Sequence, residues 1–220
     1  MFLAVIEALI FDMDGVLIDS MKQHAIAWKI AFIEVGIGVN ERDIFSLEGE
    51  NDTGIVKNIL CMNKDSCCEP EYLFTTVPAR KHELFDRDRV TMFKDMDLCL
   101  SSLKSRFKLA VVSGSDRITV ETMIDRYFPQ IFDIIVSGDD TTNGKPASDP
   151  YDKAVEILRT EKENCVVIEN AILGVMSAKN AGIFTVGLPT YLDRKELEHA
   201  DIVLKDHSEL FRFLELLMRI

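Results

Sequence analysis

Apolar residues run almost without a break through residues 1–12 and stop inside the segment FDMDGVLIDS, residues 11–20. A nearly continuous apolar strand is typical of a sheet that is covered on both faces. Between about residues 19 and 89 the apolar positions recur at helical spacing instead, as in AIAWKIAFIEVGI, TGIVKNILCM and PEYLFTTVPARKHELFDR. This part of the chain therefore predicts a helical block without strands, punctuated at Asp65–Ser66 and Pro70.

After this block the pattern alternates between strand and helix. The predicted strands are FKLAVVSG (107–114), FDIIVSG (132–138), NCVVIEN (164–170), IFTVGLP (183–189) and, as the last, DIVLKD (201–206). The predicted helices are ITVETMIDRYF, DPYDKAVEILRT, AILGVMSAKNAG and the closing SELFRFLELLMRI. Val- and Ile-rich strands that alternate with helices predict parallel βαβ units. We therefore expect an α/β domain of residues 1–16 and 92–220, interrupted by a helical insertion of residues 17–91 that is itself near domain size.

Polar residues follow four of the predicted strands where each strand ends. They are Asp12 and Asp14, then Ser113, Gly114 and Ser115, then Lys145, and finally Glu169 and Asn170. Ligands of open parallel sheets bind beyond the carboxyl ends of the strands, so these residues are expected at one rim. A single polar strand end means little, but four with complementary chemistry indicate a site.

The residue types indicate phosphate chemistry. Acidic and amide oxygens from Asp12, Glu169 and Asn170 suit a hard cation such as Mg²⁺. Ser113 and Lys145 suit a phosphate group, as a hydroxyl donor and a point charge. A cation, a phosphate cradle and an exposed carboxylate together suggest phosphoryl transfer through an aspartyl-phosphate. Residues two apart on an extended segment share a face, which lets Asp14 reach the leaving oxygen of a phosphate attacked by Asp12.

The segments FDMDGVLIDS, VVSGS, GKPASDPY and VVIENAILGVMSAKNAG closely resemble, in this order, the four motifs of the haloacid dehalogenase superfamily. The similarity is greatest to its β-phosphoglucomutase and phosphoglycolate phosphatase branch. The resemblance implies an α/β fold with a Rossmann-like parallel sheet. The implied strand order is 3-2-1-4-5, with helices on both faces and an inserted α-helical cap.

By position, the resemblance makes Asp12 the nucleophile and a Mg²⁺ ligand, and Asp14 the general acid–base and a second ligand. It assigns phosphate binding to Ser113, Gly114 and Lys145, and the rest of the metal site to Glu169 and Asn170. The family usually has Asp at the last position, so we expect a working but weaker metal site, which Asn170→Asp would strengthen. Three further residues are candidates for cap or substrate contacts: Ser20, His24 and Ser115.

Each of these three has a second interpretation. Ser20 lies at the crossover into the cap, where it is either a hinge residue or a helix cap. His24 either holds the acid–base in line, as in the mutases that the chain resembles, or faces solvent on a helix. Ser115 either contacts substrate or supports the groups that do.

The expected activity is Mg²⁺-dependent hydrolysis of a small phosphorylated metabolite, most simply a sugar phosphate. The mutases of this branch grip a second phosphate with an arginine in the cap, whereas GEND (49–52) offers two acids and no base. A phosphomutase is therefore the alternative. A catalytically idle binding or regulatory relative is the alternative of another class, and Asn170 is the only feature that favours it.

Charge and composition limit the classes of partner that we expect this protein to bind. The formal net charge of −12 argues against nucleic acid, because phosphate backbones demand a basic face. Mean hydropathy is +0.07 and the longest apolar run is too short for a bilayer, so we expect a cytoplasmic protein without membrane contact, a monomer or small homo-oligomer. Five cysteines, of which Cys61, Cys67 and Cys68 cluster, lack zinc-site spacing and are expected to be reduced.

Overall fold

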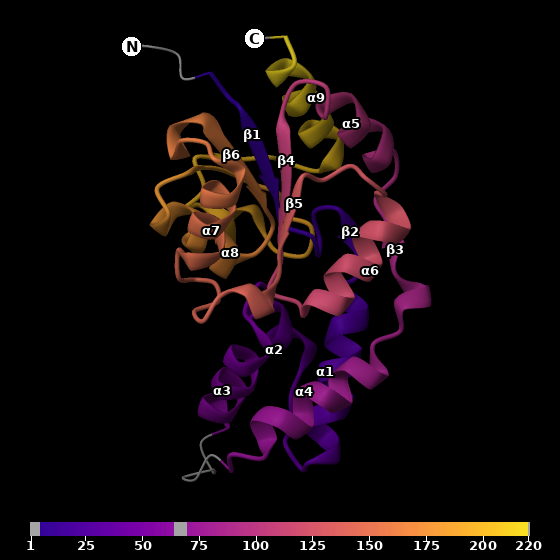
Figure 1. Cartoon of the computed structure of the whole chain (residues 1–220). Coiled ribbons are helices and arrows are strands. Elements are labelled where there is room, and N and C mark those ends of the chain that lie inside the picture. Colours follow the sequence, from indigo (N-terminus) through magenta and orange to yellow (C-terminus); the bar gives the residue numbers. More distant parts are fainter. Residues whose placement is uncertain (1–4, 64–69, 220) are drawn as a thin grey trace.

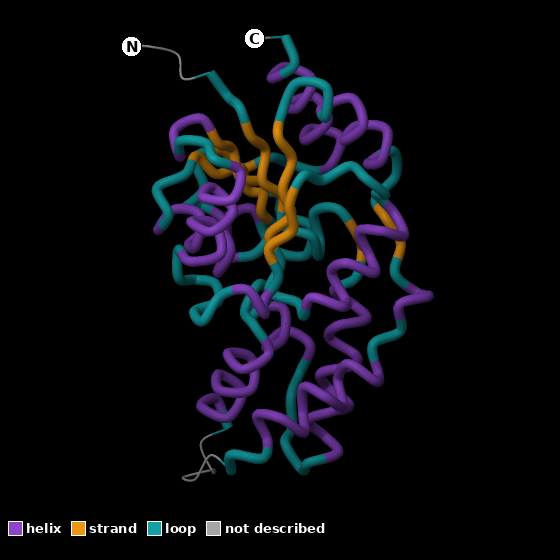
Figure 2. Tube along the Cα trace, in the orientation of Figure 1, coloured by secondary structure: helices purple, strands orange, loops and turns teal. Residues whose placement is uncertain are grey.

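The computed structural model describes residues 5–63 and 70–219. Its main sheet contains six strands in the order β5-β4-β1-β6-β7-β8, and every neighbouring pair is parallel (Figure 2). The strands are β1 Ala8–Phe11, β4 Lys108–Val112, β5 Ile134–Val136, β6 Cys165–Glu169, β7 Phe184–Gly187 and β8 Ile202–Val203. The predicted order 3-2-1-4-5 is confirmed for the first five strands, and the last predicted strand extends the sheet at the edge beside β7.

Side chains of the central strands alternate between two hydrophobic cores, as a pleated strand requires. In β1, Leu9 and Phe11 join the core on one face, whereas Ala8 and Ile10 join the core on the other. The first face is covered by α5 Met96–Leu103, α6 Arg117–Tyr127 and α9 His207–Leu217, and the second by α7 Asp149–Leu158 and α8 Ile172–Asn180. Because both faces are covered, β1 is buried throughout, as its unbroken apolar sequence predicts.

Four further helices among the described residues form the cap, which lies below the sheet in Figure 1. They are α1 Met21–Glu34, α2 Glu41–Ser46, α3 Asp52–Met62 and α4 Leu73–Leu84. Trp28 and Phe32 of α1, together with Ile59 of α3 and Val77 of α4, belong to a third hydrophobic core that is separate from the two cores of the sheet. The cap helices therefore hold together through their own apolar faces.

A short two-stranded ribbon joins the cap to the sheet domain. Strand β2 Ile18–Asp19 pairs antiparallel with β3 Thr91–Met92, so the two chain crossings lie side by side. The Tyr191 hydroxyl donates to Asp19 Oδ1 at 2.6 Å and ties this crossing to the loop after β7. The ribbon lies at the predicted domain boundaries, and the division into residues 1–16, 17–91 and 92–220 stays a prediction.

Some elements differ from the sequence prediction. Strand β1 is shorter than predicted, and residues 1–4 lie outside the described residues, as do Asp65–Ser66, Cys67 and Cys68. Helices α2 and α5 were not predicted, because they are short and their apolar periodicity spans about two turns at most. Among the described residues no helix is long and apolar enough to cross a membrane.

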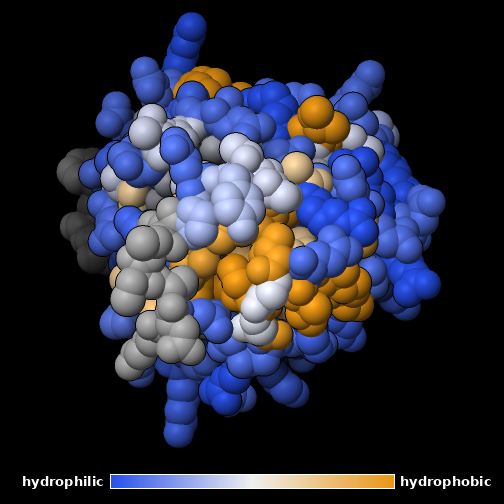
Figure 3. Space-filling model, turned by 90° about the horizontal axis from the view of Figure 1, so that it is seen from below, coloured by the Kyte–Doolittle hydropathy of each residue, from blue (hydrophilic) through white to orange (hydrophobic). Residues whose placement is uncertain are grey.

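The surface at the cap end is mainly hydrophilic, with an apolar area in its middle (Figure 3). Apolar cap residues with substantial exposure include Ile30, Ile33 and Met62. Two of them lie on α1, whose other face packs into the cap core. The exposed apolar surface of the cap therefore lies on the outside of helices that also form its interior.

Candidate active site

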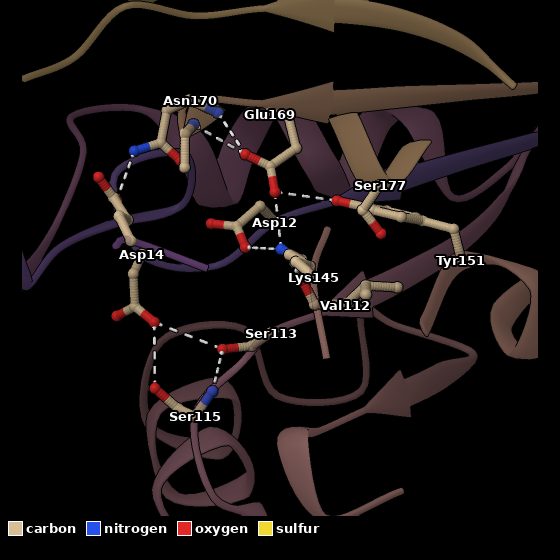
Figure 4. Close-up of polar contacts among 12 residues, drawn as sticks. Asp12, Asp14, Val112, Ser113, Ser115, Lys145, Tyr151, Glu169, Asn170 and Ser177 are labelled. Carbon is tan, nitrogen blue, oxygen red and sulfur yellow. Dashed lines mark hydrogen bonds and ion pairs between the residues drawn. The ribbon is translucent and has the colours of Figure 1, made fainter. Parts of the chain in front are cut away.

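The site begins where β1 ends, at Asp12, beside the buried ammonium group of Lys145 (Figure 4). Only 1% of Lys145 is exposed, and its Nζ lies 2.6 Å from Asp12 Oδ1 and 2.6 Å from Glu169 Oε1. The same ammonium donates to the Val112 carbonyl at 3.3 Å. The second oxygen of Asp12 points away from Lys145 in Figure 4. One cation is thus shared by two carboxylates that come from neighbouring strands, β1 and β6.

Burial and neighbouring charges act in opposite directions on the pKa values of Lys145 and Asp12. Burial would lower the pKa of Lys145, but the Asp12 and Glu169 carboxylates outweigh it and hold that pKa well above its usual range. Burial raises the pKa of Asp12 well above its ordinary value, and Lys145 opposes this effect. Lys145 therefore stays charged, and it provides the positive charge that a buried anionic group needs.

Four side chains converge on Asp14, each from a position that the sequence marks as a candidate. Ser20 Oγ donates to Asp14 Oδ1, and His24 Nε2 lies 3.2 Å from the same oxygen. The hydroxyls of Ser113 and Ser115 each lie 3.4 Å from Oδ2, and the Ser115 amide donates to Ser113 Oγ. Asp14 is therefore held from the cap on one oxygen and from the loop after β4 on the other.

These contacts decide the protonation state of Asp14. Burial acts to raise its pKa, but the charge and hydrogen bond of His24 and the hydrogen bond of Ser20 outweigh burial and lower the pKa to about 2. The ring of His24 stacks on Phe85 at 4.1 Å between centroids, which keeps it in the interior rather than in solvent. Asp14 is thus an ionised carboxylate at neutral pH.

Glu169 is engaged at both carboxylate oxygens. Oε1 accepts from Lys145 and from the Tyr151 hydroxyl at 3.0 Å, and Oε2 accepts from the backbone amides of Asn170 and Ala171 at 2.7 and 2.9 Å. The two amides lie at the start of α8, where a negative charge is favourable. In this arrangement Glu169 positions Lys145, and its predicted role as a metal ligand stays a prediction.

Asn170 contacts an acid from the cap. Its Nδ2 donates to Glu48 Oε1 at 2.6 Å, and both residues are buried, with 0% and 5% of their surfaces exposed. Asn170 Oδ1 and Glu48 Oε2 are buried oxygens without a hydrogen-bond partner among the described residues. Burial raises the pKa of Glu48 well above its usual range, with further upward contributions from Asp12 and Asp14.

The cap segment after Glu48 packs directly on the rim of the sheet. A Cβ on Gly114 would lie 2.5 Å from the Gly49 carbonyl oxygen and 2.7 Å from that of Glu50. A Cβ on Gly144 would lie 3.0 Å from Asn51 Nδ2. No larger side chain fits at Gly114 without displacing the cap backbone, so glycine is required there for this closed arrangement.

A pocket lies between the cap and the strand ends. Its lining includes Trp28, Glu48, Glu50, Asp52 and Lys81 of the cap, and Asp12, Asp14 and Ser115 of the rim. Lys81 is buried, with Nζ 3.7 Å from Asp52 Oδ1 and 5.2 Å from the centroid of the Trp28 ring. We call the side of this pocket that the cap forms, which includes Trp28, Glu48, Glu50, Asp52 and Lys81, the cap wall. Among the described residues, its only buried cation, Lys81, is thus paired with an acid.

The structure brings the ten predicted site residues together in two linked groups. Asp12, Lys145, Glu169 and Asn170 form one, Asp14, Ser20, His24, Ser113 and Ser115 form the other, and Gly114 contacts the cap. Sequence reasoning missed Glu48 and Tyr151. The sequence holds one hint of the role of Glu48. It is an acid directly before GEND (49–52), and the chain carries an amide, Asn170, where the family usually has an acid.

The donor set fits a divalent cation. Buried oxygens without partners are costly unless something binds them, and among the described residues Asn170 Oδ1 and Glu48 Oε2 are two such atoms. Glu48 lines the same pocket as Asp12, and Asn170 is hydrogen-bonded to Glu48. No group of three or more His, Cys, Asp or Glu side chains in residues 5–63 and 70–219 is arranged to hold a metal by itself. A metal here therefore depends on an amide or backbone oxygen as well as on carboxylates.

Comparisons with known proteins agree with this geometry. Residues 9–188 match the haloacid dehalogenase-like hydrolase family. The chain belongs to this family. It is 30% identical to validoxylamine A 7'-phosphate phosphatase of Streptomyces hygroscopicus subsp. limoneus, with 91% of this chain and 94% of the relative covered. It is 31% identical to the phosphoglycolate phosphatase of Aquifex aeolicus, with coverages of 94% and 96%.

The crystal structure of β-phosphoglucomutase from Clostridium difficile has the same fold, with a TM-score of 0.84 at 22% identity and 97% of both chains covered. The resemblance read from the four motifs is therefore confirmed, and so is the predicted enzyme class, a phosphoric monoester hydrolase of the haloacid dehalogenase type. Enzymes of this class generally use Mg²⁺.

Proposed function

We propose that this chain is a Mg²⁺-dependent phosphatase that hydrolyses a small phosphorylated metabolite through an aspartyl-phosphate on Asp12. The observation that carries the proposal is the pairing of Asp12 with the buried cation Lys145, beside a second carboxylate, Asp14, that is held separately. Two neighbouring carboxylates with different partners and oppositely shifted pKa values are suited to different tasks.

In the first half of the reaction an oxygen of Asp12 attacks phosphorus, and the bond from phosphorus to the metabolite oxygen breaks. Lys145 and Ser113 hold the phosphoryl oxygens, and the leaving oxygen takes a proton through Asp14. His24, 3.2 Å from Asp14, is placed to supply that proton when its ring is protonated. Asp12 and Asn170, with the backbone carbonyl of Asp14, would hold the Mg²⁺, which when bound would neutralise charge on the phosphoryl group.

In the second half water attacks the phosphorus of the aspartyl-phosphate. Asp14 takes a proton from this water, the bond between phosphorus and Asp12 breaks, and inorganic phosphate leaves. Asp14 is ionised at neutral pH, so its carboxylate is available to accept this proton. The hydrogen bonds from Ser20 and Ser115 keep it aimed at the site.

The cap wall favours hydrolysis over transfer to a second position of a sugar. A mutase must hold a bisphosphate, which needs a second cationic anchor. The cation at this wall, Lys81, is already paired with Asp52, and its neighbours Glu48 and Glu50 are acids. Carboxylates and an aromatic ring suit hydroxyl groups and an apolar ring face, so the substrate that we propose is a sugar phosphate or a similar polyol phosphate.

The test is phosphate release from p-nitrophenyl phosphate and acetyl phosphate with Mg²⁺ and with EDTA, followed by a panel of phosphorylated metabolites. We expect release that requires Mg²⁺ and is abolished by Asp12→Asn in a protein with an unchanged circular dichroism spectrum. Activity retained in Asp12→Asn contradicts the mechanism, and no release from any compound favours an idle binding relative. Glucose 1-phosphate with a trace of the bisphosphate separates a mutase, which forms glucose 6-phosphate, from a phosphatase.

A further inference from the structure

Two buried oxygens at the contact between cap and core have no hydrogen-bond partner in the part of the chain that the structure describes. Glu48 Oε2 comes from the cap, Asn170 Oδ1 follows β6, and both belong to side chains that are at least nine-tenths buried. A native structure rarely leaves buried oxygens unpaired, and an ion that binds them is one of the few explanations. The two side chains are joined by the 2.6 Å hydrogen bond from Asn170 Nδ2 to Glu48 Oε1, so their free oxygens lie in one small region.

This region borders the reacting carboxylate. Glu48, Asp12 and Asp14 line the same pocket. The buried ammonium group of Lys145 is already engaged by Asp12 and Glu169, and that of Lys81 is paired with Asp52. The described residues thus place several acids here beside two cations that are already paired. Oxygen ligands with an excess of negative charge, buried and only partly hydrogen-bonded, are what Mg²⁺ or Mn²⁺ requires.

We propose that Glu48 is a ligand of the active-site cation, so that the metal bridges the cap and the core. The inference rests on the proposed phosphatase function, and it assigns to a cap residue the negative charge that the neutral side chain of Asn170 does not supply. Gly49 and Glu50, which follow Glu48, contact Gly114 through their backbone carbonyls, so the position of Glu48 depends on the closed cap. Metal binding and cap closure are therefore coupled.

The experiment measures Mn²⁺ and Mg²⁺ binding to the purified full-length protein by isothermal titration calorimetry, with electron paramagnetic resonance for Mn²⁺. Glu48→Gln keeps the shape of the side chain and an oxygen that can accept from Asn170, but it removes the charge and one oxygen. We expect the Kd for Mn²⁺ to rise about 10-fold or more. Glu50→Gln is the matched control: it removes the same charge from the same cap segment, and we expect a change of less than about threefold.

A double variant places a carboxylate on the core side of this contact in place of the one removed from the cap. In Glu48→Gln with Asn170→Asp, the carboxylate moves to the other side of the contact, and we expect a Kd within about threefold of the wild-type value. If Glu48→Gln alone does not fold, this double variant decides: a restored Kd supports the inference, and a Kd weakened 10-fold overturns it. The rise in melting temperature on adding Mg²⁺, which reports binding without turnover, should follow the same order across the variants.

Wild-type affinity in Glu48→Gln overturns the assignment and leaves the phosphatase function standing, provided that the wild type releases phosphate with Mg²⁺. Equal weakening by Glu48→Gln and Glu50→Gln also overturns it, because the effect is then one of general charge. A wild-type protein that binds neither cation and releases no phosphate overturns the assignment and the proposed function together.

Discussion

The strongest energetic prediction concerns Lys145. Lys145→Met keeps an unbranched side chain but removes the ammonium group, and it leaves Asp12 and Glu169 buried without their shared cation. Two charge-assisted hydrogen bonds of 2.6 Å are lost, each worth about 1.5–3 kcal/mol. Removal of one partner from a buried ion pair costs about 3–5 kcal/mol, so we expect the free energy of unfolding to fall by that amount near pH 8.

The loss should depend on pH in a definite direction. Without Lys145, the carboxyl of Asp12 keeps a pKa raised by burial, above the pKa of about 3.9 that it has in the unfolded chain. The folded variant then holds a proton that the unfolded chain releases, so its stability falls as the pH rises above about 4. In the wild type Lys145 opposes this effect, so the pKa of Asp12 is raised less and less stability is lost at high pH. The deficit of the variant relative to the wild type is therefore larger at pH 8 than at pH 5.

The assay is urea denaturation followed by circular dichroism at both pH values, with EDTA present so that no metal replaces the lysine. Lys22→Met, at an exposed position on α1, is the control and should change stability by less than about 0.5 kcal/mol. The double variant Lys145→Met with Asp12→Asn should recover part of the lost free energy of unfolding, and this loss should depend less on pH. A deficit for Lys145→Met below about 1 kcal/mol at pH 8, or an equal deficit at pH 5, refutes the reasoning.

Three further predictions concern the groups around this cation. Because the pKa of Asp14 is lowered to about 2, its ionised form stabilises the fold, and this stabilisation is lost as the pH falls below about 4. In urea titrations, the difference in free energy of unfolding between wild type and Asp14→Asn should therefore shrink by about 1 kcal/mol from pH 5 to pH 3. Asn170→Asp should lower the Mg²⁺ concentration that gives half-maximal activity, and an unchanged or higher value contradicts direct ligation. Gly114→Ala should lower kcat/KM by about 100-fold, since its Cβ displaces the cap backbone by an ångström or so; wild-type kinetics contradict the closed arrangement.

The rim of the site could be predicted from sequence because it follows from local rules. Unbroken apolar strands indicate a covered parallel sheet, and the carboxyl ends of such strands share one edge. Asp12 and Ser113 each follow a strand directly and Glu169 is the last residue of one, so the sheet alone brings them together. Lys145 lies nine residues after Val136, the last residue of β5, so strand order indicates only its edge of the sheet, and the motif GKPASDPY adds its role.

The cap wall could not be predicted in the same way. Helical periodicity shows which residues of α4 are buried, but not that Lys81 reaches Asp52 and the Trp28 ring. Glu48 lies in a short turn between α2 and α3, where periodicity carries no information. Its contact with Asn170 joins positions 122 residues apart and exists only through the docking of the cap on the sheet.

The ribbon of β2 and β3 has a consequence for how such enzymes diversify. The chain leaves the sheet domain at Ile18–Asp19 and returns at Thr91–Met92, and these two crossings are hydrogen-bonded to each other. Exchange of the segment between them has to match one small, self-paired junction and the contacts of the cap with the rim of the sheet. A chimera that carries the cap of another family member on this sheet would therefore keep the reacting carboxylates and the lysine while acquiring a new substrate wall. Because Glu48 lies in the exchanged segment, the chimera would lose it. The donor of the new cap would therefore have to be chosen for an acid at that turn as well as for its pocket.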